Sequence, residues 1–505
     1  MQFINADSLD YRLPVNVAND SIRNGNLVHV TLAALHQFPP FVPSSAFSPA
    51  VQHLYEQRRG SASALSPAEI LDLSPERREH WRRVVIYWIC ATIVRNHPAL
   101  QDVPTQLRAE LTAGLASLRE GLPLQRDRGV WKSQRQVLPV LRHNLGEDDG
   151  VAAFLDEALP LISDTEKDKD KGAKLVTGNL RTTRAIDRMK RYRLPARDPA
   201  AQLHHVHTLP QLFHVELNAL YGLVDTYYSA NSGSPASLHE HAVLISGRPL
   251  NPSCPNFRRA VDLFTIAYDA RVLDCVRLAV DSSPSSSLDT LTQQTFSSFD
   301  DVLNLARTTA SQFSFFSGVT QDRRRALEDE VGAFSLDFLA SMTAFLELRH
   351  SIRVGNYGCI WAMIHWWMIF FKGSGASNYA DELLELHVKF HHELPPELQA
   401  AYEGAWLFNA EGKEGEFVGV DYVIEGDVRE AKETFDRAAE VDDDFVHAVA
   451  TGASDSVSFP PVAPGAPAYS RPYHVVPPHL DVLKTLGSII PTRVHEPVPH
   501  RFLVP

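Results

Sequence analysis

Cysteine is scarce in this chain. Its four cysteines among 505 residues are scattered, with no CxxC pair and no closely spaced cysteine and histidine. Structural zinc modules and disulfide frameworks both depend on such local spacing, so the sequence argues against both. Residues 1–7 also lack the basic and apolar segments of a secretory signal. We therefore predict an intracellular protein of the nucleus or cytoplasm.

Long hydrophobic runs are missing too. The most apolar stretch, residues 359–371 (CIWAMIHWWMIFF), is interrupted by His365. A membrane-spanning helix needs about 20 apolar residues, and this stretch is clearly shorter. We predict a buried helix here and no membrane partner.

Positive charge is in deficit, since the formal net charge is -13. Such a chain repels phosphate backbones as a whole, so any contact with nucleic acid must be local. The one concentrated basic segment lies between residues 181 and 197, where Asp187 is the only acid. We name four of its arginines as candidate nucleic-acid-binding residues: Arg181, Arg184, Arg188 and Arg191. The alternative is that they pair with the chain's own surplus carboxylates.

The sequence also lacks the common cofactor and hydrolase motifs. It has no P-loop, no dinucleotide-binding GxGxxG, no GxSxG elbow and no HExxH. The HxH at residues 205–207 is more typical of a hydrogen-bonded histidine cluster than of a zinc site. We therefore predict no small-molecule cofactor and no bound metal.

What is present is the composition of a folded protein, with 44% hydrophobic and 22% charged residues. Four segments are expected: an extended N-terminal arm (1–60), a helical region (61–165), a core domain (166–440) and a Pro-rich, partly disordered tail (441–505). Capping signals at Ser66 and Ser74 predict two helix starts.

Hydrophobic periodicity decides the fold class. Apolar residues recur at steps of three and four over residues 257–279 and 327–345, which predicts two amphipathic helices. Residues 174–178 are the best short strand, and a basic helix follows them. The fold class is therefore mainly α with a small β element around residues 174–210.

Residues 378–386 (NYADELLEL), 406–409 (WLFN) and 412–421 carry a resemblance to a known family. They resemble domain-of-unknown-function family 6589, which is abundant in mushroom-forming fungi (basidiomycetes) and often found in transposon-like reading frames. The resemblance extends over roughly residues 60–440. Members look like decayed relatives of RNase H-like transposases, which implies a degenerate RNase H-like α/β core embedded in helices.

The resemblance also implies where a catalytic site would lie. RNase H-like nucleases hold two metal ions with carboxylates at strand ends and on a later helix. Family members have a Gly-Asp pair in the segment that resembles residues 174–193, and Asn179 replaces that aspartate here. An amide brings no negative charge to Mg²⁺. The other acids that could complete such a site are Glu216, Asp225 and Glu382, although Glu382 could equally face solvent.

Two functions follow from this resemblance. The leading one is a noncatalytic, transposon-derived protein that binds nucleic acid or a protein partner. The alternative is a metal-dependent DNA strand-transferase or nuclease that uses Mg²⁺. Asn179 is the residue that separates the two, because it stands where a metal-binding aspartate is expected.

Overall fold

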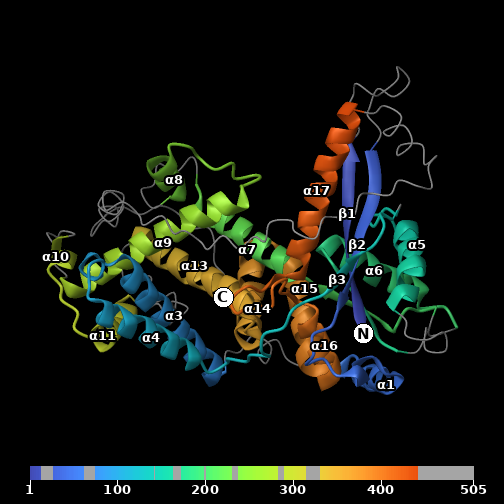
Figure 1. The fold of residues 1–505 in the computed structure, drawn as a ribbon, viewed down its shortest axis with the longest axis horizontal. Helices are drawn as coiled ribbons and strands as arrows, with labels where there is room; N and C mark the ends of the chain where they lie inside the picture. The colour runs from blue at the N-terminus through green and yellow to red at the C-terminus, as the bar shows by residue number, and fades with distance from the viewer. Residues whose placement is uncertain are drawn as a thin grey trace.

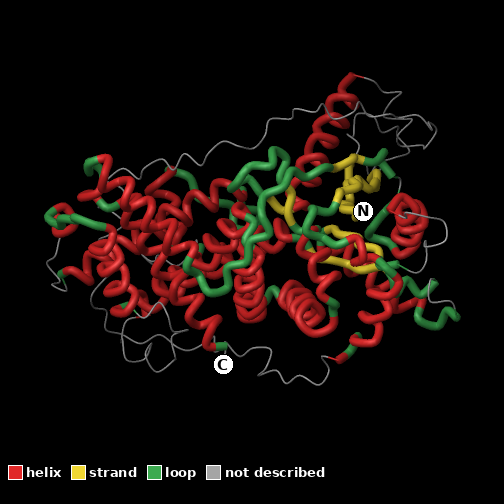
Figure 2. Tube along the Cα trace, turned by 60° about the horizontal axis from the view of Figure 1, so that its bottom comes forward, coloured by secondary structure: helices red, strands yellow, loops and turns green. Residues whose placement is uncertain are grey.

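The computed structural model describes residues 1–12, 27–61, 74–141, 143–162, 172–197, 201–229, 237–281, 289–313 and 330–441. The molecule is elongated, with its larger sheet at one end, a small pair of strands near the middle and helices in the rest (Figures 1 and 2). The predicted fold class, mainly α with a small β element, is confirmed.

A five-stranded mixed sheet forms the strand-bearing end. Its spatial order is β3-β2-β1-β4-β5. β1 and β2 form a long antiparallel hairpin, β3 pairs antiparallel with β2, and β4 and β5 run parallel to β1. The strands are β1 (Gln2–Arg12), β2 (Leu27–Gln37), β3 (Arg135–Val137), β4 (Lys174–Gly178) and β5 (Val206–Pro210). The strand expected at residues 174–178 is thus β4.

The N-terminal segment occupies the centre of this sheet. We expected residues 1–60 as an extended arm over a body, whereas β1 lies between β2 and β4. Its alternating side chains explain this position. Ile4 and Ala6 pack into one apolar cluster, while Phe3 belongs to the large core on the opposite face. Asn5 and Asp7 share that opposite face, so their polarity masks the strand pattern.

Helices cover both faces of the sheet. α5 (Asp148–Ala158) and α6 (Leu180–Arg193) close the Ile4 face, where their apolar residues join the same cluster as Val176. α17 (Val420–Val441) lies along β1 and β2 on the other face (Figure 1). We call the five strands with α5, α6 and α17 the sheet region.

The remaining length of the molecule is a helical body with one large apolar core. Its helices are α3 (Pro75–Asn96), α4 (Thr105–Glu120), α7 (Leu212–Tyr227), α8 (Leu238–Ser246), α9 (Phe257–Val280), α10 (Asp289–Thr292), α11 (Phe299–Gln312), α13 (Glu330–Val354) and α14 (Tyr357–Gly373). Four further helical elements are α1 (Pro49–Arg58), α15 (Ser377–Val388), a π-helical turn (Lys389–Glu393) and α16 (Pro396–Gly404). Of these, α15 contacts both α14 of the body and β5 of the sheet. Within the described residues, the 3₁₀ turns are Ser44–Phe47, Pro98–Leu100 and Leu159–Ile162.

The apolar stripes predicted from the sequence appear as α9 and α13. Ser74 caps α3 as expected, since its side chain accepts a hydrogen bond from the Arg77 amide. The predicted helix start at Ser66 and the predicted Pro-rich tail from residue 442 onward lie outside the described residues.

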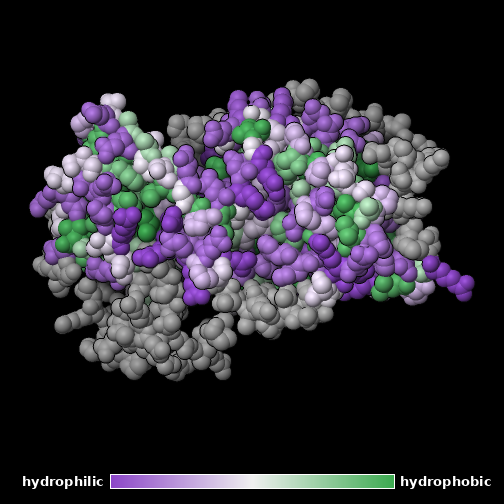
Figure 3. All heavy atoms as spheres, turned by 90° about the horizontal axis from the view of Figure 1, so that it is seen from below, coloured by the Kyte–Doolittle hydropathy of each residue, from purple (hydrophilic) through white to green (hydrophobic). Residues whose placement is uncertain are grey.

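Residues 359–371 form most of α14, a helix whose side chains are mainly buried, as predicted. One helix, Val331–Val354 within α13, is long and apolar enough to span a membrane by length and composition, and 61% of its most apolar window is buried inside the fold. Core helices of folded domains pass the same test. On the face shown in Figure 3, hydrophobic residues form small patches separated by hydrophilic ones.

Candidate functional site

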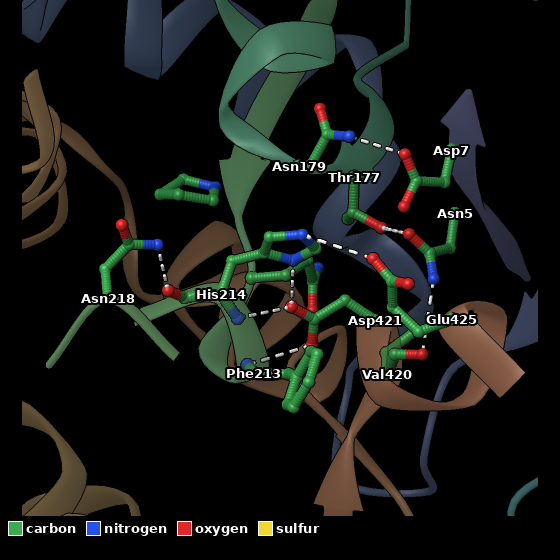
Figure 4. Close-up of polar contacts among 12 residues, drawn as sticks. Asn5, Asp7, Thr177, Asn179, Phe213, His214, Asn218, Val420, Asp421 and Glu425 are labelled. Atoms are coloured by element: carbon green, nitrogen blue, oxygen red, sulfur yellow. Dashed lines mark hydrogen bonds and ion pairs between the residues drawn. The ribbon is translucent and has the colours of Figure 1, made fainter. Parts of the chain in front are cut away.

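Five polar residues from four elements meet where the sheet joins the helical body (Figure 4). They are Asp7 on β1, Asn179 directly after β4, His214 in the first turn of α7, and Asp421 and Glu425 at the start of α17. We call them the polar cluster. The sheet register explains part of it, because Ala6 of β1 pairs with Gly178 of β4. The residues that follow this pair along the two strands are Asp7 and Asn179, and Asn179 is the N-cap of α6.

The side chain of Asn179 has two structural roles, capping α6 and contacting Asp7. Its side-chain oxygen accepts a hydrogen bond from the Thr182 amide at 2.9 Å and so caps α6. Its side-chain nitrogen donates to the Asp7 carboxylate. The amide can accept and donate at once, whereas an ionised aspartate could only accept. An aspartate here would face Asp7 with a like charge unless a cation lay between them.

A short hairpin positions the start of α17. Its strands are β6 (Leu407–Phe408) and β7 (Val418–Gly419), and the family-like Gly-rich turn joins them. Trp406 is buried and donates its indole N–H to the Pro210 carbonyl at 3.0 Å. Asn409 closes the turn by accepting from the Gly412 amide at 2.8 Å. This arrangement places Asp421 at the N-terminal end of α7.

Asp421 fastens α17 to α7. Its carboxylate is 1% exposed and accepts the backbone N–H groups of Phe213 and His214 at 3.0 and 2.9 Å. These groups lack helical partners because they belong to the first turn of α7. The carboxylate also accepts from His214 Nδ1 at 2.9 Å. Asp421 is therefore already saturated by the chain itself.

His214 carries a positive charge between two acids. Its Nδ1 bonds Asp421, and its Nε2 lies 3.4 Å from Glu425 Oε1. Burial alone would lower the pKa of His214, but the hydrogen bonds to Asp421 and Glu425 outweigh it and raise the pKa to about 10. The hydrogen bond between His214 and Glu425 lowers the pKa of Glu425. At neutral pH the site holds an imidazolium.

Asp7 is the weakly acidic member of the cluster. Burial raises its pKa to about 7, and the nearby charge of Glu425 adds to the rise. Around neutral pH this carboxyl group therefore exchanges its proton, while Glu425 stays ionised.

The ligand atoms of Asp7, His214 and Glu425 lie within 4.8 Å of one another, which invites comparison with a metal site. A two-metal nuclease site does not fit these residues. Both His214 nitrogens face carboxylates, and the oxygen of Asn179 is engaged by α6. The imidazolium supplies the cationic charge that an ion would bring.

A pocket opens beside the polar cluster. It is lined by Asn179, Leu180, Arg181, Arg184, His214 and Tyr379, of which three carry positive charge. Arg184 reaches across it to α15, where it donates to the side-chain and backbone oxygens of Asn378 at 2.8 and 2.6 Å. The N-terminus of α6 points into the same space. Helix N-termini and arginines both attract anions.

The acids named from the sequence lie around this site rather than in it. Glu382 lies 3.5 Å from Arg184, and burial followed by the charge of Glu385 raises its pKa to about 7. Glu216 is partly buried on α7 and pairs with Arg349, while Asp225 is exposed near the C-terminal end of α7. Of the four candidates, the structure brings only Asn179 into the polar cluster.

The basic residues named from the sequence follow α6 away from the pocket. Arg181 and Arg191 are exposed, and Arg188 donates to Asp148 at 2.8 Å. Arg184 and Arg188 thus contact the chain's own acids, which was the alternative to phosphate. Both guanidinium groups remain partly exposed, so these contacts leave them within reach of a ligand.

The sequence contained a signal for the residues we did not name. Asp421 and Glu425 are four residues apart at the start of a helix, directly after the Gly-rich turn. Asp7 lies within residues 3–9, where polar side chains hide the alternation of a buried strand. His214 follows β5 by four residues, and in the sequence it stood out only as a histidine near the HxH of residues 205–207.

A mainly helical fold whose mixed sheet brings together polar residues from β1, the end of β4 and α17 defines a class of protein with its site where the sheet meets the helical body. Within that class, the chain belongs to a family of unknown function, DUF6589, whose model matches residues 60–452. The match begins after β1 and β2, so the strand that carries Asp7 lies outside it. No curated protein and no solved structure matches the chain.

Proposed function

We propose that this chain is a noncatalytic, transposon-derived protein of fungal ancestry that binds nucleic acid in the nucleus or cytoplasm. The strand order β3-β2-β1-β4-β5, with β4 and β5 parallel to β1, supports this because it is the order of RNase H-like nucleases. Asp7, Asn179 and Glu425 occupy β1, the position directly after β4, and α17, the last helix of the described residues. These are the places where such enzymes carry metal-binding carboxylates.

One observation is the main support for a noncatalytic function. The chain compensates its own carboxylates, with His214 between Asp421 and Glu425 and the Asn179 amide on Asp7. Two-metal catalysis needs an open site with uncommitted carboxylates to hold both ions. Here the polar groups hold α6, α7 and α17 together instead.

The same arrangement favours phosphate binding. The pocket presents Arg181, Arg184 and the charged His214 around the N-terminus of α6. Backbone phosphates are the anions that such a surface attracts, and the basic side of α6 continues it to Arg188 and Arg191. A local site of this kind overcomes the repulsion expected from a net charge of -13.

Fluorescence anisotropy with a labelled oligonucleotide tests the proposal. We expect binding in EDTA, with log K falling by about 3 per tenfold rise in salt for three to four phosphate contacts. Replacing Arg184, Arg188 and Arg191 by glutamine should abolish it. The control replaces Arg78, Arg82 and Arg108, which removes the same charge from the helical body and should weaken binding only slightly. Absence of binding at low salt would overturn the proposal.

The alternative is a metal-dependent nuclease or strand-transferase. The proximity of the Asp7, His214 and Glu425 ligand atoms is the observation that favours it. A cleavage assay with Mg²⁺ or Mn²⁺ separates the two functions, and we expect no cutting. Cutting that disappears in both Asp7→Asn and Glu425→Gln would establish the alternative. Cutting unaffected by these variants would indicate a contaminating nuclease.

A further inference from the structure

The exposed side of α6 ends in an aromatic ring. Tyr192 is 63% exposed, and it is the only aromatic residue among the large hydrophobic side chains that stand exposed in the described part of the chain. Leu194, two residues further on, is 50% exposed. Aromatic rings supply much of the buried area in protein cores, so a ring left in water invites an explanation.

Tyr192 shares a helical face with the basic residues. Arg181, Arg184, Arg188 and Tyr192 follow one another at steps of three, four and four, which places them on one side of α6. At a rise of 1.5 Å per residue, this stripe is about 16 Å long. It begins at the pocket beside the polar cluster and ends at the exposed ring.

Two acidic side chains from neighbouring helices lie beside this stripe. Asp148 of α5 accepts from Arg188, and Glu382 of α15 lies beside Arg184. The Arg188–Asp148 pair is well exposed on both sides, at 40% and 36% of the side-chain surface. Exposed pairs of this kind contribute little free energy, so a phosphate can compete for the guanidinium.

We propose that α6 binds single-stranded nucleic acid, with phosphates along Arg181, Arg184 and Arg188 and an unpaired base stacked on Tyr192. The inference rests on the proposed nucleic-acid function and adds the form of the ligand. Every base has a π face that can stack on an aromatic ring, and a positively charged groove beside such rings is the usual single-strand platform. In a duplex these faces are covered by neighbouring bases, so Tyr192 can contribute only to single strands.

The test compares a single-stranded oligonucleotide, as DNA and as RNA, with its duplex. Stacking contributes about 1–3 kcal/mol per base, so Tyr192→Ala should weaken single-strand binding by about 5- to 150-fold. Duplex binding should stay within about twofold, because the phosphate contacts remain. Tyr192→Phe keeps the ring and should restore single-strand affinity. Tyr221→Ala, on α7, is the matched control. Quenching of a fluorescent base analogue by Tyr192 would report the stack directly.

Two further outcomes are distinguishable. If neither single strands nor duplexes bind, the proposed function itself fails. If single strands bind but Tyr192→Ala changes nothing, or weakens the duplex equally, only the stacking inference is overturned. Asp148→Asn removes the competing carboxylate from Arg188 and should tighten single-strand binding several-fold. A loss of affinity in that variant would show that Asp148 instead holds Arg188 in its binding position.

Discussion

The helical body and the sheet region bury their polar groups in different ways. In the body, a large apolar core surrounds buried ion pairs such as Arg119 with Glu347, whose carboxylate also accepts hydrogen bonds from Trp88 and Ser351. In the sheet region, the polar cluster gathers three carboxylates and one imidazolium at a single point. Burial of apolar area is the main source of stability in the body, where burial also raises the pKa of Asp274 to about 6. The cluster depends instead on matched charges at a single point. The two ends should therefore respond differently to mutation and to pH.

The largest effect is expected in the body, from Trp367→Ala. Trp367 is completely buried and packs its ring against Trp366, Phe370 and Phe371. Removing a buried tryptophan costs about 3–5 kcal/mol, a large share of the stability of a typical domain. Chemical denaturation measures the loss. Trp366→Ala is the control, and its half-buried ring predicts a smaller loss. Equal values would contradict the picture of an apolar core centred on one side of α14.

The next largest effect is expected in the sheet region, from Asp421→Ala. The variant leaves two N–H groups of α7 without an acceptor and His214 with a single acid. Breaking one side of a buried charged pair costs about 3 kcal/mol. Asp421→Asn keeps an acceptor for an N–H group and should lose only about half as much. If alanine and asparagine are equally mild, the cluster contributes nothing to holding α17 on α7.

This comparison also explains what the sequence could reveal. The helices of the body follow from periodicity, because residues 257–279 and 359–371 are apolar where the core requires it. The sheet region could be predicted from the sequence only in part. β4 is a continuous buried run and was predicted, but no local pattern indicates that β1 and β2 pair with each other. A strand that carries Asn5 and Asp7 inward does not show the alternation of a half-buried strand.

The candidate site was predictable only in part for the same reason. Asn179 follows directly from a strand and a helix cap, both of which are local features. Its partners come from residues 7, 214, 421 and 425, and only the folded sheet brings these together. Glu382 and Glu216 were reasonable choices by type, yet each lies beside an arginine. Sequence reasoning identifies a class of side chain, while strand order decides which members meet.

A pH titration sharpens the contrast between the two regions. The pKa of Asp7 is raised to about 7 from 3.8, so the folded state binds this proton more tightly than the unfolded chain. Stability from this group is present below about pH 4 and is lost as the pH rises towards 7. The Asp7→Asn variant has no such carboxyl group, so this loss of stability with rising pH should be absent from it. We expect the variant to gain about 2 kcal/mol relative to wild type between pH 5 and pH 8.

Denaturation curves at the two pH values measure this difference. His214 contributes in the same direction in both proteins, since its raised pKa gives stability that is full below pH 6.5 and lost towards pH 10. It therefore largely cancels in the comparison. Asp225→Asn, an exposed acid on α7, is the control and should show no such change. A pH-independent difference for Asp7→Asn would mean that Asp7 is not buried beside Glu425.

The smallest effect concerns one surface cation from each region. Arg188 pairs with Asp148 in the sheet region, and Lys372 lies 3.4 Å from Asp381 at the end of α14. Both pairs are exposed, so Arg188→Gln and Lys372→Gln should each change stability by less than about 0.5 kcal/mol. Their effects on oligonucleotide affinity should nevertheless differ. Losing one phosphate contact lowers the salt slope by about 0.9, and only Arg188 lies on the basic side of α6. If the two variants change the salt dependence equally, the net charge of the chain and not the surface of α6 governs binding.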